Sequence, residues 1–310
     1  MTPASLYIKQ LINSGNNPID VFWCTVRYGA SPNNYRDFNF RELTANQRST
    51  YVTHGFSQYI IKTYNNPAYI DLFEDKTKFA EHFSTYFGRK WLSTEGITKD
   101  KLKDFMDSVG GRIILKPAFE AQGAGIIVFD DADLEEVWEK VNNMPKSILE
   151  EWIQQHEELN SVYQEAINCL RIITLYKDGK THFLAGGMTW GNGKKIANAS
   201  ASGIVSPVNF ETGQLDKPAA DFHENCYKNH PITGANLIGI KIPYWKETIK
   251  MLKQATKVVP EVGYIGWDIA ITPEGPVLIE GNTTPGYKYY QIPVHMENKC
   301  GNKYRYKKWL

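Results

Sequence analysis

The chain has 310 residues, and its 42% of hydrophobic and 13% of aromatic residues are enough to fill one large core or two to three smaller ones. Its 35 Lys and Arg residues against 34 Asp and Glu residues give a net charge of +1, which excludes an overall field that would attract nucleic acid or an anionic membrane. No apolar run reaches the roughly 18 residues of a membrane span, and the N-terminus lacks the pattern of a secretory signal. We therefore expect a globular, cytoplasmic protein.

The four cysteines are far apart in the sequence and form neither a CxxC motif nor a cluster with histidines; they are Cys24, Cys169, Cys226 and Cys300. This spacing argues against structural zinc and against a disulfide framework. We expect all four to be reduced and buried as small hydrophobic residues, and a single nucleophilic cysteine is the alternative.

The first unit, residues 1–72, is rich in turn signals such as Ser31-Pro32-Asn33-Asn34 and is predicted to be small, helical and irregular. The second unit, residues 73–158, begins with a helix whose apolar stripe at positions 79, 80, 83, 86 and 87 places Lys76 in its first turn. Strands are predicted over 112–117, 126–129 and 147–153, with an amphipathic helix over 131–142.

A glycine-rich loop, Gln122-Gly123-Ala124-Gly125, lies between the first two of these strands. No helix follows it, which excludes a P-loop and a dinucleotide-binding fingerprint. Two interpretations remain: an ordinary turn, or a flap whose backbone amides approach phosphate oxygens. Lys116, which ends the preceding strand, would supply a positive charge nearby.

The third unit, residues 159–310, is predicted to continue with a strand over 170–176, a turn at 177–180 and a return strand. Residues 186–217 are rich in turn formers, and 243–258 form an amphipathic helix. Strands grouped with helices outside a βαβ rhythm indicate an α+β fold.

The most informative segment is the predicted hairpin Gly266–Asn282. If Pro273-Glu274-Gly275 is its loop, Thr272 faces Pro276, Asp268 faces Glu280, and Asn282 lies on the same face as Glu280. Two opposed carboxylates destabilise a sheet unless a cation separates them, and with an amide oxygen they form a ligand set that Mg²⁺ prefers. The alternative is a solvated hairpin edge, and a one-residue slip would move Asp268 to the other face.

These motifs together resemble the ATP-grasp superfamily, in particular the sugar-transfer-associated ATP-grasp proteins found among polysaccharide biosynthesis genes. The resemblance covers nearly the whole chain. The matching segments are 29–36, Asp75-Lys76, 114–125, 149–159, 167–175, 230–234 and 266–282.

The resemblance implies an ATP-grasp fold, in which two α+β subdomains clamp ATP, and it implies roles for individual residues. Asp268, Glu280 and Asn282 would bind Mg²⁺ and act in catalysis, with Arg171 as a further catalytic residue. The nucleotide would be held by Lys76, Lys116, Gln122, Gly123, Gly125, Glu150, Glu151, Ile153, Glu157 and Asn198. Ala197 departs from the family, which usually has Asp before this Asn.

Simpler interpretations remain open for single residues. Lys76 could be a solvated lysine, Arg171 a structural ion-pair partner, and Glu158 instead of Glu157 could meet the ribose. His156 and His230 are more simply explained as satisfied structural histidines than as substrate groups. The basic and aromatic tail 302–310 could contact anionic glycans, nucleic acid or a membrane surface, although a packed or solvated terminus explains it as well.

The function implied by the resemblance is that of an ATP- and Mg²⁺-dependent, ADP-forming carboxylate ligase. It would form an acyl phosphate and then an amide, on small-molecule or glycan-linked carboxylate and amine substrates. A kinase acting on a hydroxyl and a non-catalytic nucleotide-binding protein are the alternatives. No nucleic-acid partner and no membrane span are expected.

Overall fold

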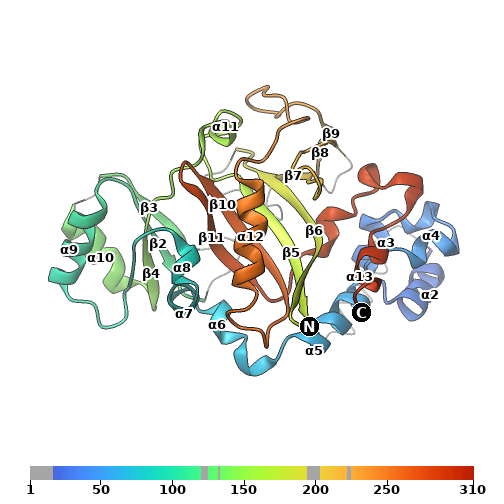
Figure 1. Cartoon of the computed structure of the whole chain (residues 1–310), viewed down its shortest axis with the longest axis horizontal. Helices are drawn as coiled ribbons and strands as arrows, with labels where there is room; N and C mark the ends of the chain where they lie inside the picture. The colour runs from blue at the N-terminus through green and yellow to red at the C-terminus, as the bar shows by residue number, and fades with distance from the viewer. Residues whose placement is uncertain (1–16, 120–124, 132, 194–202, 222–224) are drawn as a thin grey trace.

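The computed structural model describes residues 17–119, 125–131, 133–193, 203–221 and 225–310. Two antiparallel sheets dominate it, with helices packed around them (Figure 1). The small sheet has the order β1-β4-β2-β3, and the large sheet has the order β11-β10-β5-β6-β7-β8-β9. Every strand pair of the two sheets is antiparallel, and helices pack around them, which confirms the predicted α+β class.

The strands of the small sheet are β1 (Trp91–Ser93), β2 (Ile113–Pro117), β3 (Ile127–Phe129) and β4 (Ser147–Glu151). Helices α9 (Lys99–Val109) and α10 (Leu134–Asn143) pack on it, on the left of Figure 1. Leu102 and Val137 from these helices join Leu115 and Leu149 from the strands in one buried cluster. The sequence analysis did not predict β1 or α9.

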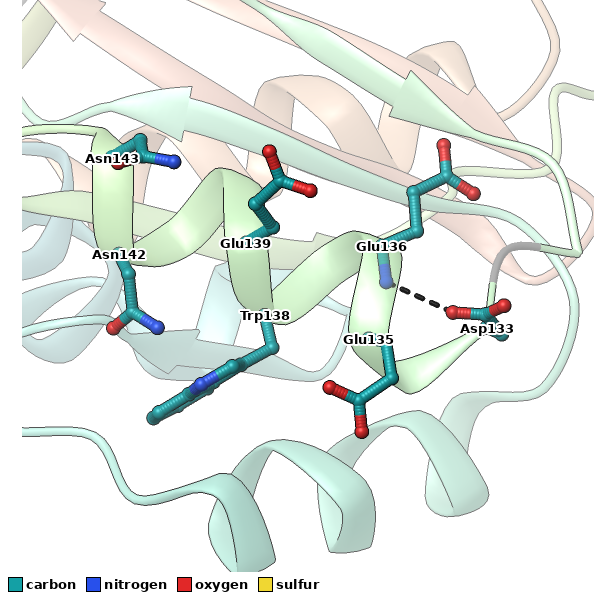
Figure 2. Close-up of a pocket in the computed structure, with 7 residues that line it drawn as sticks. All are labelled: Asp133, Glu135, Glu136, Trp138, Glu139, Asn142 and Asn143. Atoms are coloured by element: carbon teal, nitrogen blue, oxygen red, sulfur yellow. Dashed lines mark hydrogen bonds between the residues drawn. The ribbon is translucent and has the colours of Figure 1, made fainter.

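Helix α10 begins later than predicted. Asp133, not Asp131, is its N-cap, and the Asp133 carboxylate accepts a 2.9 Å hydrogen bond from the Glu136 backbone N–H (Figure 2). Asp131 has a positive φ of 53° and precedes the helix. Glu135, Glu136 and Glu139 are exposed along this helix. Glu135 pairs with Lys99 of α9.

The large sheet consists of β5 (Cys169–Lys177), β6 (Lys180–Trp190), β7 (Ile204–Pro207), β8 (Ala219–Ala220), β9 (Cys226–Tyr227), β10 (Tyr264–Thr272) and β11 (Gly275–Asn282). Helix α12 (Trp245–Ala255) crosses one face of this sheet (Figure 1). The predicted bounds of α12 were three residues too long at its C-terminal end. The turn-rich segment 186–217 also contains the end of β6 and all of β7, which were not predicted.

The first residues form short helices: α2 (Pro18–Tyr28), α3 (Pro32–Asp37), η1 (Phe40–Glu42), α4 (Ala45–Ser49), α5 (His54–Tyr64) and η2 (Pro67–Tyr69). The chain's last segments, η3 (Tyr287–Tyr290), η4 (Pro293–His295), η5 (Glu297–Lys299) and α13 (Lys303–Lys307), lie beside them at the right of Figure 1. Asn34 and Tyr287 join the two groups through a 3.0 Å hydrogen bond. Tyr306 is 1% exposed and anchors the tail, whereas Tyr304, Lys307 and Lys308 are exposed.

Helices α6 (Asp71–Glu74), α7 (Lys76–His82), α8 (Ser84–Phe87) and α11 (Glu157–Asn160) complete the fold. Helices α6 and α7 pack on β11 at Gly281, which has no side chain. A Cβ added to Gly281 would lie 2.8 Å from Phe73 and 3.1 Å from Phe79. This close approach holds the helix that carries Lys76 against the strand that carries Glu280.

The division of the chain at residues 72 and 158 stays a proposal. Cys24 and Cys169 are buried as expected, whereas Cys226 and Cys300 are exposed, which corrects the expectation for those two. Among the described residues, no helix is long and apolar enough to cross a membrane.

Candidate active site

A row of charged side chains crosses three neighbouring strands of the large sheet. Asp268 on β10 is paired with Arg171 on β5 and with Glu280 on β11. Paired residues of adjacent strands present their side chains on the same face of a sheet. The structure therefore brings together the four predicted catalytic residues, because Asn282 lies two residues beyond Glu280 on the same strand.

The predicted Asp268–Glu280 pairing is confirmed, but the predicted turn is wrong. Thr272 faces Gly275, so the loop contains only Pro273 and Glu274. A bulge in β11, where Ile269 pairs with Leu278 while Asp268 pairs with Glu280, inserts one extra residue and restores the register. The prediction made the loop one residue too long and omitted the one extra residue of the bulge, and these two errors cancelled.

The Asp268 carboxylate is fully engaged with Arg171. The Nε and Nη2 groups of Arg171 each donate to one oxygen of Asp268, forming a two-pronged ion pair. Burial alone would lower the pKa of the guanidinium, but the charge of Asp268 and its hydrogen bonds, with smaller contributions from Tyr290 and Cys169, together raise that pKa. Arg171 thus neutralises Asp268 and leaves Glu280 without an equivalent partner in the row.

Glu280 carries the excess negative charge of this row. Burial, and then the neighbouring Asp268 carboxylate, raise the pKa of Glu280, while Arg171 and Lys76 only partly oppose that shift. A carboxylate with a raised pKa is a group that a nearby cation would stabilise in its charged form.

Asn282 completes a donor set suited to a hard cation. Its Nδ2 donates to Glu280 Oε1 at 3.2 Å and approaches Asp268 Oδ2 at 3.4 Å. Half a turn of the amide would present Oδ1 to the same place, and such amide orientations are assigned from hydrogen bonding. Two carboxylates and an amide oxygen fit Mg²⁺. Among the described residues, no group of three or more His, Cys, Asp or Glu side chains could hold a metal ion.

A second charged cluster belongs to the small sheet. Glu150 Oε2 on β4 accepts from Lys116 Nζ on β2 at 2.8 Å and from Arg89 Nε at 2.6 Å. Burial would raise the pKa of Glu150, but Arg89 and Lys116 together lower it. Burial lowers the pKa of Lys116, and Arg89 adds to that effect against the pull of Glu150. Two cations share one carboxylate, so this cluster has excess positive charge.

Arg89 was missed by the sequence analysis. It is only 2% exposed, its guanidinium lies 3.4 Å from the Phe87 ring centroid, and its Nη1 donates to the carbonyl oxygens of Phe87 and Leu278 at 2.8 Å each. Its Nη2 is buried and has no hydrogen-bond partner among the described residues. Because Leu278 belongs to β11, Arg89 ties the small sheet to the strand that carries Glu280. Its isolated position between a helix and a three-residue strand gave no sequence signal.

Lys76 lies close to both clusters. Its backbone N–H donates to the Ala118 carbonyl at 3.0 Å, just beyond Lys116, and its charge acts on Glu280. Asp75 is the N-cap of this helix and pairs with Lys146 at 2.9 Å. Lys76 is therefore the first helical residue and lies in the first turn, as predicted. Gly125 has a φ of 68°, and a Cβ there would lie 2.9 Å from Pro117, so this end of the loop packs against β2.

The predicted adenine hinge is partly changed by the structure. The Glu150 carboxylate accepts from Lys116 and Arg89 through Oε2, which also gives it a supporting role behind the lysine, and its contact with the base stays a prediction. The Glu151 N–H donates to the Lys90 carbonyl at 2.9 Å, so this N–H is already engaged. Within the described residues, no backbone bond occupies the Ile153 N–H.

Glu157 and Glu158 are both exposed at the start of α11, so the structure does not choose between them for the ribose. His156 is the N-cap of that helix, and its Nδ1 accepts from the Glu158 N–H at 3.3 Å. His230 is 1% exposed, bonds the Gly191 carbonyl through Nε2 at 2.6 Å, and stacks on Tyr163. These contacts support the structural interpretation of both histidines.

Three predicted nucleotide ligands, Gln122, Gly123 and Asn198, lie outside the described residues. The described part still unites two lysines, two arginines and three carboxylates between the two sheets. One side has excess positive charge and the other has excess negative charge. Such a site can bind a polyphosphate together with a divalent cation.

Comparison with known proteins assigns the class of this fold. The model of the family described as sugar-transfer associated ATP-grasp matches residues 56–297. The chain therefore belongs to the sugar-transfer associated ATP-grasp family, and it has the ATP-grasp fold expected from the resemblance. A search of curated proteins finds no match.

Several solved structures are similar in fold. They include the ATP-grasp ligase PsnB in complex with a precursor variant, Mg and ADP, at 15% identity and a TM-score of 0.46, covering 76% of this chain and 58% of that one. N5-carboxyaminoimidazole synthetase from Staphylococcus aureus with ADP has 11% identity and a TM-score of 0.47, covering 76% and 52%. L-amino acid ligase from Bacillus licheniformis has 13% identity and a TM-score of 0.45, covering 73% and 44%. This chain thus spans about half the length of these proteins.

Proposed function

We propose that the protein is an ATP- and Mg²⁺-dependent, ADP-forming ligase that joins a carboxylate to an amine. The observation that carries this proposal is the opposed charge of the two clusters. Lys116 and Arg89 offer positive charge to phosphate groups, while Glu280, Asp268 and Asn282 offer oxygen ligands to Mg²⁺. Mg²⁺ bound there would neutralise charge on the phosphoryl oxygens.

In the proposed reaction, a carboxylate oxygen of the substrate attacks the γ-phosphorus. The bond from that phosphorus to the bridging oxygen breaks, and ADP leaves with its electron pair. The amine nitrogen then attacks the acyl carbon, phosphate leaves, and the amine loses a proton. The protein's contribution is to orient the groups and to stabilise charge, so no nucleophilic side chain is required.

The residues divide this work according to their positions. Lys76 and Lys116 hold phosphate oxygens, the loop ending at Gly125 covers them, and Arg171 keeps Asp268 oriented. Glu151 and Ile153 offer backbone groups to the base, and Glu157 meets the ribose. Gln122, Gly123 and Asn198 are proposed as further nucleotide ligands. The proposed substrate is a small or glycan-linked carboxylate. The protein would act in polysaccharide biosynthesis, in the cytoplasm.

The test is a screen of carboxylates and amines, including amino acids and uronic acids, with ATP and Mg²⁺, in which ADP and AMP are measured separately. We expect ADP release that depends on the carboxylate, and hydroxylamine should trap the acyl phosphate as a hydroxamate. A phosphorylated product stable to hydroxylamine would instead identify a kinase. Nucleotide binding without turnover across the panel would indicate a non-catalytic protein.

A further inference from the structure

A large cleft lies along the open edge of strand β6. Its volume is ≈ 1290 Å³, which exceeds the roughly 300–1,000 Å³ typical of small-molecule pockets. Thr181, Phe183 and Gly186 of β6 line its floor, and α12 and α13 supply parts of its walls. We name this space the β6 cleft.

The edge of β6 is open because β7 is short. Strand β6 runs from Lys180 to Trp190, but β7 pairs with it only from Gly187 onward. Within the described residues, no strand pairs with positions 180–185 on that side, whereas the Gly186 carbonyl already accepts from the Val208 N–H at 3.1 Å. An unpaired edge exposes backbone donors and acceptors that an added extended peptide can bind.

The walls of the cleft are positively charged. The lining contains six Lys or Arg residues and three Asp or Glu residues. One of the acids, Glu297, already pairs with Lys217 at 3.2 Å. Lys253 on α12 and Lys303 and Lys307 on α13 have no acidic partner among the described residues.

Lys303 is the clearest example of a cleft lysine whose charge no carboxylate of the described residues neutralises. It is partly buried, with its Nζ 4.4 Å from the Phe56 ring centroid, and burial followed by repulsion from Lys307 lowers its pKa. A partly buried ammonium without a carboxylate is stabilised by an incoming anion.

The cleft also leads toward the charged row. Tyr290 lines it and lies close enough to Arg171 for the guanidinium charge to act on the phenol. Gly186 precedes Gly187, which is paired with Arg171 across the sheet. About four residues of extended chain, roughly 13 Å, would reach along the open part of the edge from Thr181 to Ala185, just before this point.

We propose that the β6 cleft binds an extended acidic peptide, which adds a strand to β6 and pairs its carboxylates with Lys253, Lys303 and Lys307. An open strand edge favours a peptide because only a peptide backbone can continue the ladder, and the lysines favour acidic side chains. The proposal goes beyond the ligase reaction, and its test requires neither ATP nor turnover.

The probe is fluorescein-labelled hexaglutamate, titrated with the full chain at low salt and followed by fluorescence anisotropy. We expect saturable binding that weakens with added salt. Lys253→Ala, Lys303→Ala and Lys307→Ala should each weaken binding by about 2- to 5-fold, and the triple variant by about 10-fold or more. Lys250→Ala, on the same helix α12 but outside the cleft, is the matched control and should bind like the wild type. Thermal melts confirm that each variant folds.

Two further ligands separate strand addition from simple charge attraction. Hexaglutamate that is N-methylated at alternate backbone nitrogens keeps its charge but loses donors for the ladder, and it should bind about 10-fold more weakly or worse. A hexagalacturonate of equal charge should also bind more weakly. Equal binding of the methylated peptide, tighter binding of the uronate, or no binding of hexaglutamate would overturn the proposal.

Discussion

The two charged clusters use the same kinds of side chain with opposite results. On the small sheet, Glu150 is shared by Lys116 and Arg89, so one positive charge exceeds what the carboxylate can neutralise. On the large sheet, Arg171 neutralises Asp268, and Glu280 remains in excess. The contrast teaches that neither cluster is a self-sufficient structural ion pair. In the proposed function, phosphate would bring the negative charge that the first cluster lacks, and Mg²⁺ would bring the positive charge that the second lacks.

Arg89 connects the two clusters mechanically. It bonds Glu150 on the small sheet and the Leu278 carbonyl on the large sheet. A shift of one sheet against the other would therefore break a buried, charge-assisted hydrogen bond, which is costly. The geometry of the site should depend on this residue as much as on the ligands themselves.

The largest effect is expected at Glu280, which carries the excess negative charge of the cluster on the large sheet. Glu280→Gln should reduce carboxylate-dependent ADP release by about 1000-fold, since a metal ligand supplies several kcal/mol of transition-state stabilisation. The melting temperature without ligand should not fall, because the variant removes a carboxylate whose raised pKa marks it as unfavourable.

The matched control for this prediction is Glu274→Gln, at the exposed turn of the same hairpin, which should retain wild-type turnover. Steady-state kinetics and thermal melts measure both variants. Normal turnover in Glu280→Gln would remove the magnesium assignment.

The next effect tests the opposite cluster. Arg89→Met should lower the free energy of unfolding by about 3 kcal/mol, because it deprives the buried Glu150 of one of its two cations and loses the link to Leu278. Glu150→Gln in the same chain should recover part of that loss. Urea denaturation of both single variants and the double variant gives the coupling energy, and simple additivity would show that the two side chains do not depend on each other.

A smaller effect concerns the packing that holds the clusters together. Gly281→Ala should destabilise the fold by about 2 kcal/mol, because its Cβ would lie 2.8 Å from Phe73. Phe73→Leu should restore part of the stability by making room. If Gly281→Ala melts at the wild-type temperature, α6 and α7 are not held against β11 as described.

The smallest effect is a pH dependence. In the proposed site, Mg²⁺ requires the charged Glu280 carboxylate, and the pKa of Glu280 is raised in the folded protein. The affinity for Mg²⁺–nucleotide should therefore rise with pH through that pKa and then level off. Below it, affinity should fall by up to about tenfold per pH unit. At alkaline pH the lowered pKa of Lys116 should weaken phosphate binding again. Calorimetry across pH measures both limbs, and a flat acidic limb contradicts the role of Glu280.

The same shift has a defined sign for stability without ligand. Since the folded pKa of Glu280 exceeds its unfolded value, the folded state binds the proton more tightly. The contribution of Glu280 to stability is complete below the unfolded pKa and is lost as pH rises through the folded pKa.

The sequence predicted much of the site because local rules place its residues. Alternation along β10 and β11 brought Asp268, Glu280 and Asn282 to one face, and the helix stripe placed Lys76 in a first turn. It did not predict the bulge in β11 or the two-residue turn, and the two resulting register errors had opposite sign, so the predicted pairing was still correct. Arg89 and the contact of Glu150 with two cations arise from packing between sheets, which no local pattern encodes. The short strand β7 left the edge of β6 open for a similar reason.

The central claim is that the two clusters hold Mg²⁺ and a nucleoside triphosphate between them. Its most direct test is the affinity for a non-hydrolysable ATP analogue, measured by calorimetry with and without Mg²⁺ in the wild type, Lys116→Met and Glu280→Gln. We predict that Mg²⁺ tightens binding in the wild type, that Lys116→Met binds weakly in both conditions, and that Glu280→Gln binds equally with and without Mg²⁺. A Glu280→Gln variant whose affinity still rises with Mg²⁺ as in the wild type would contradict the claim.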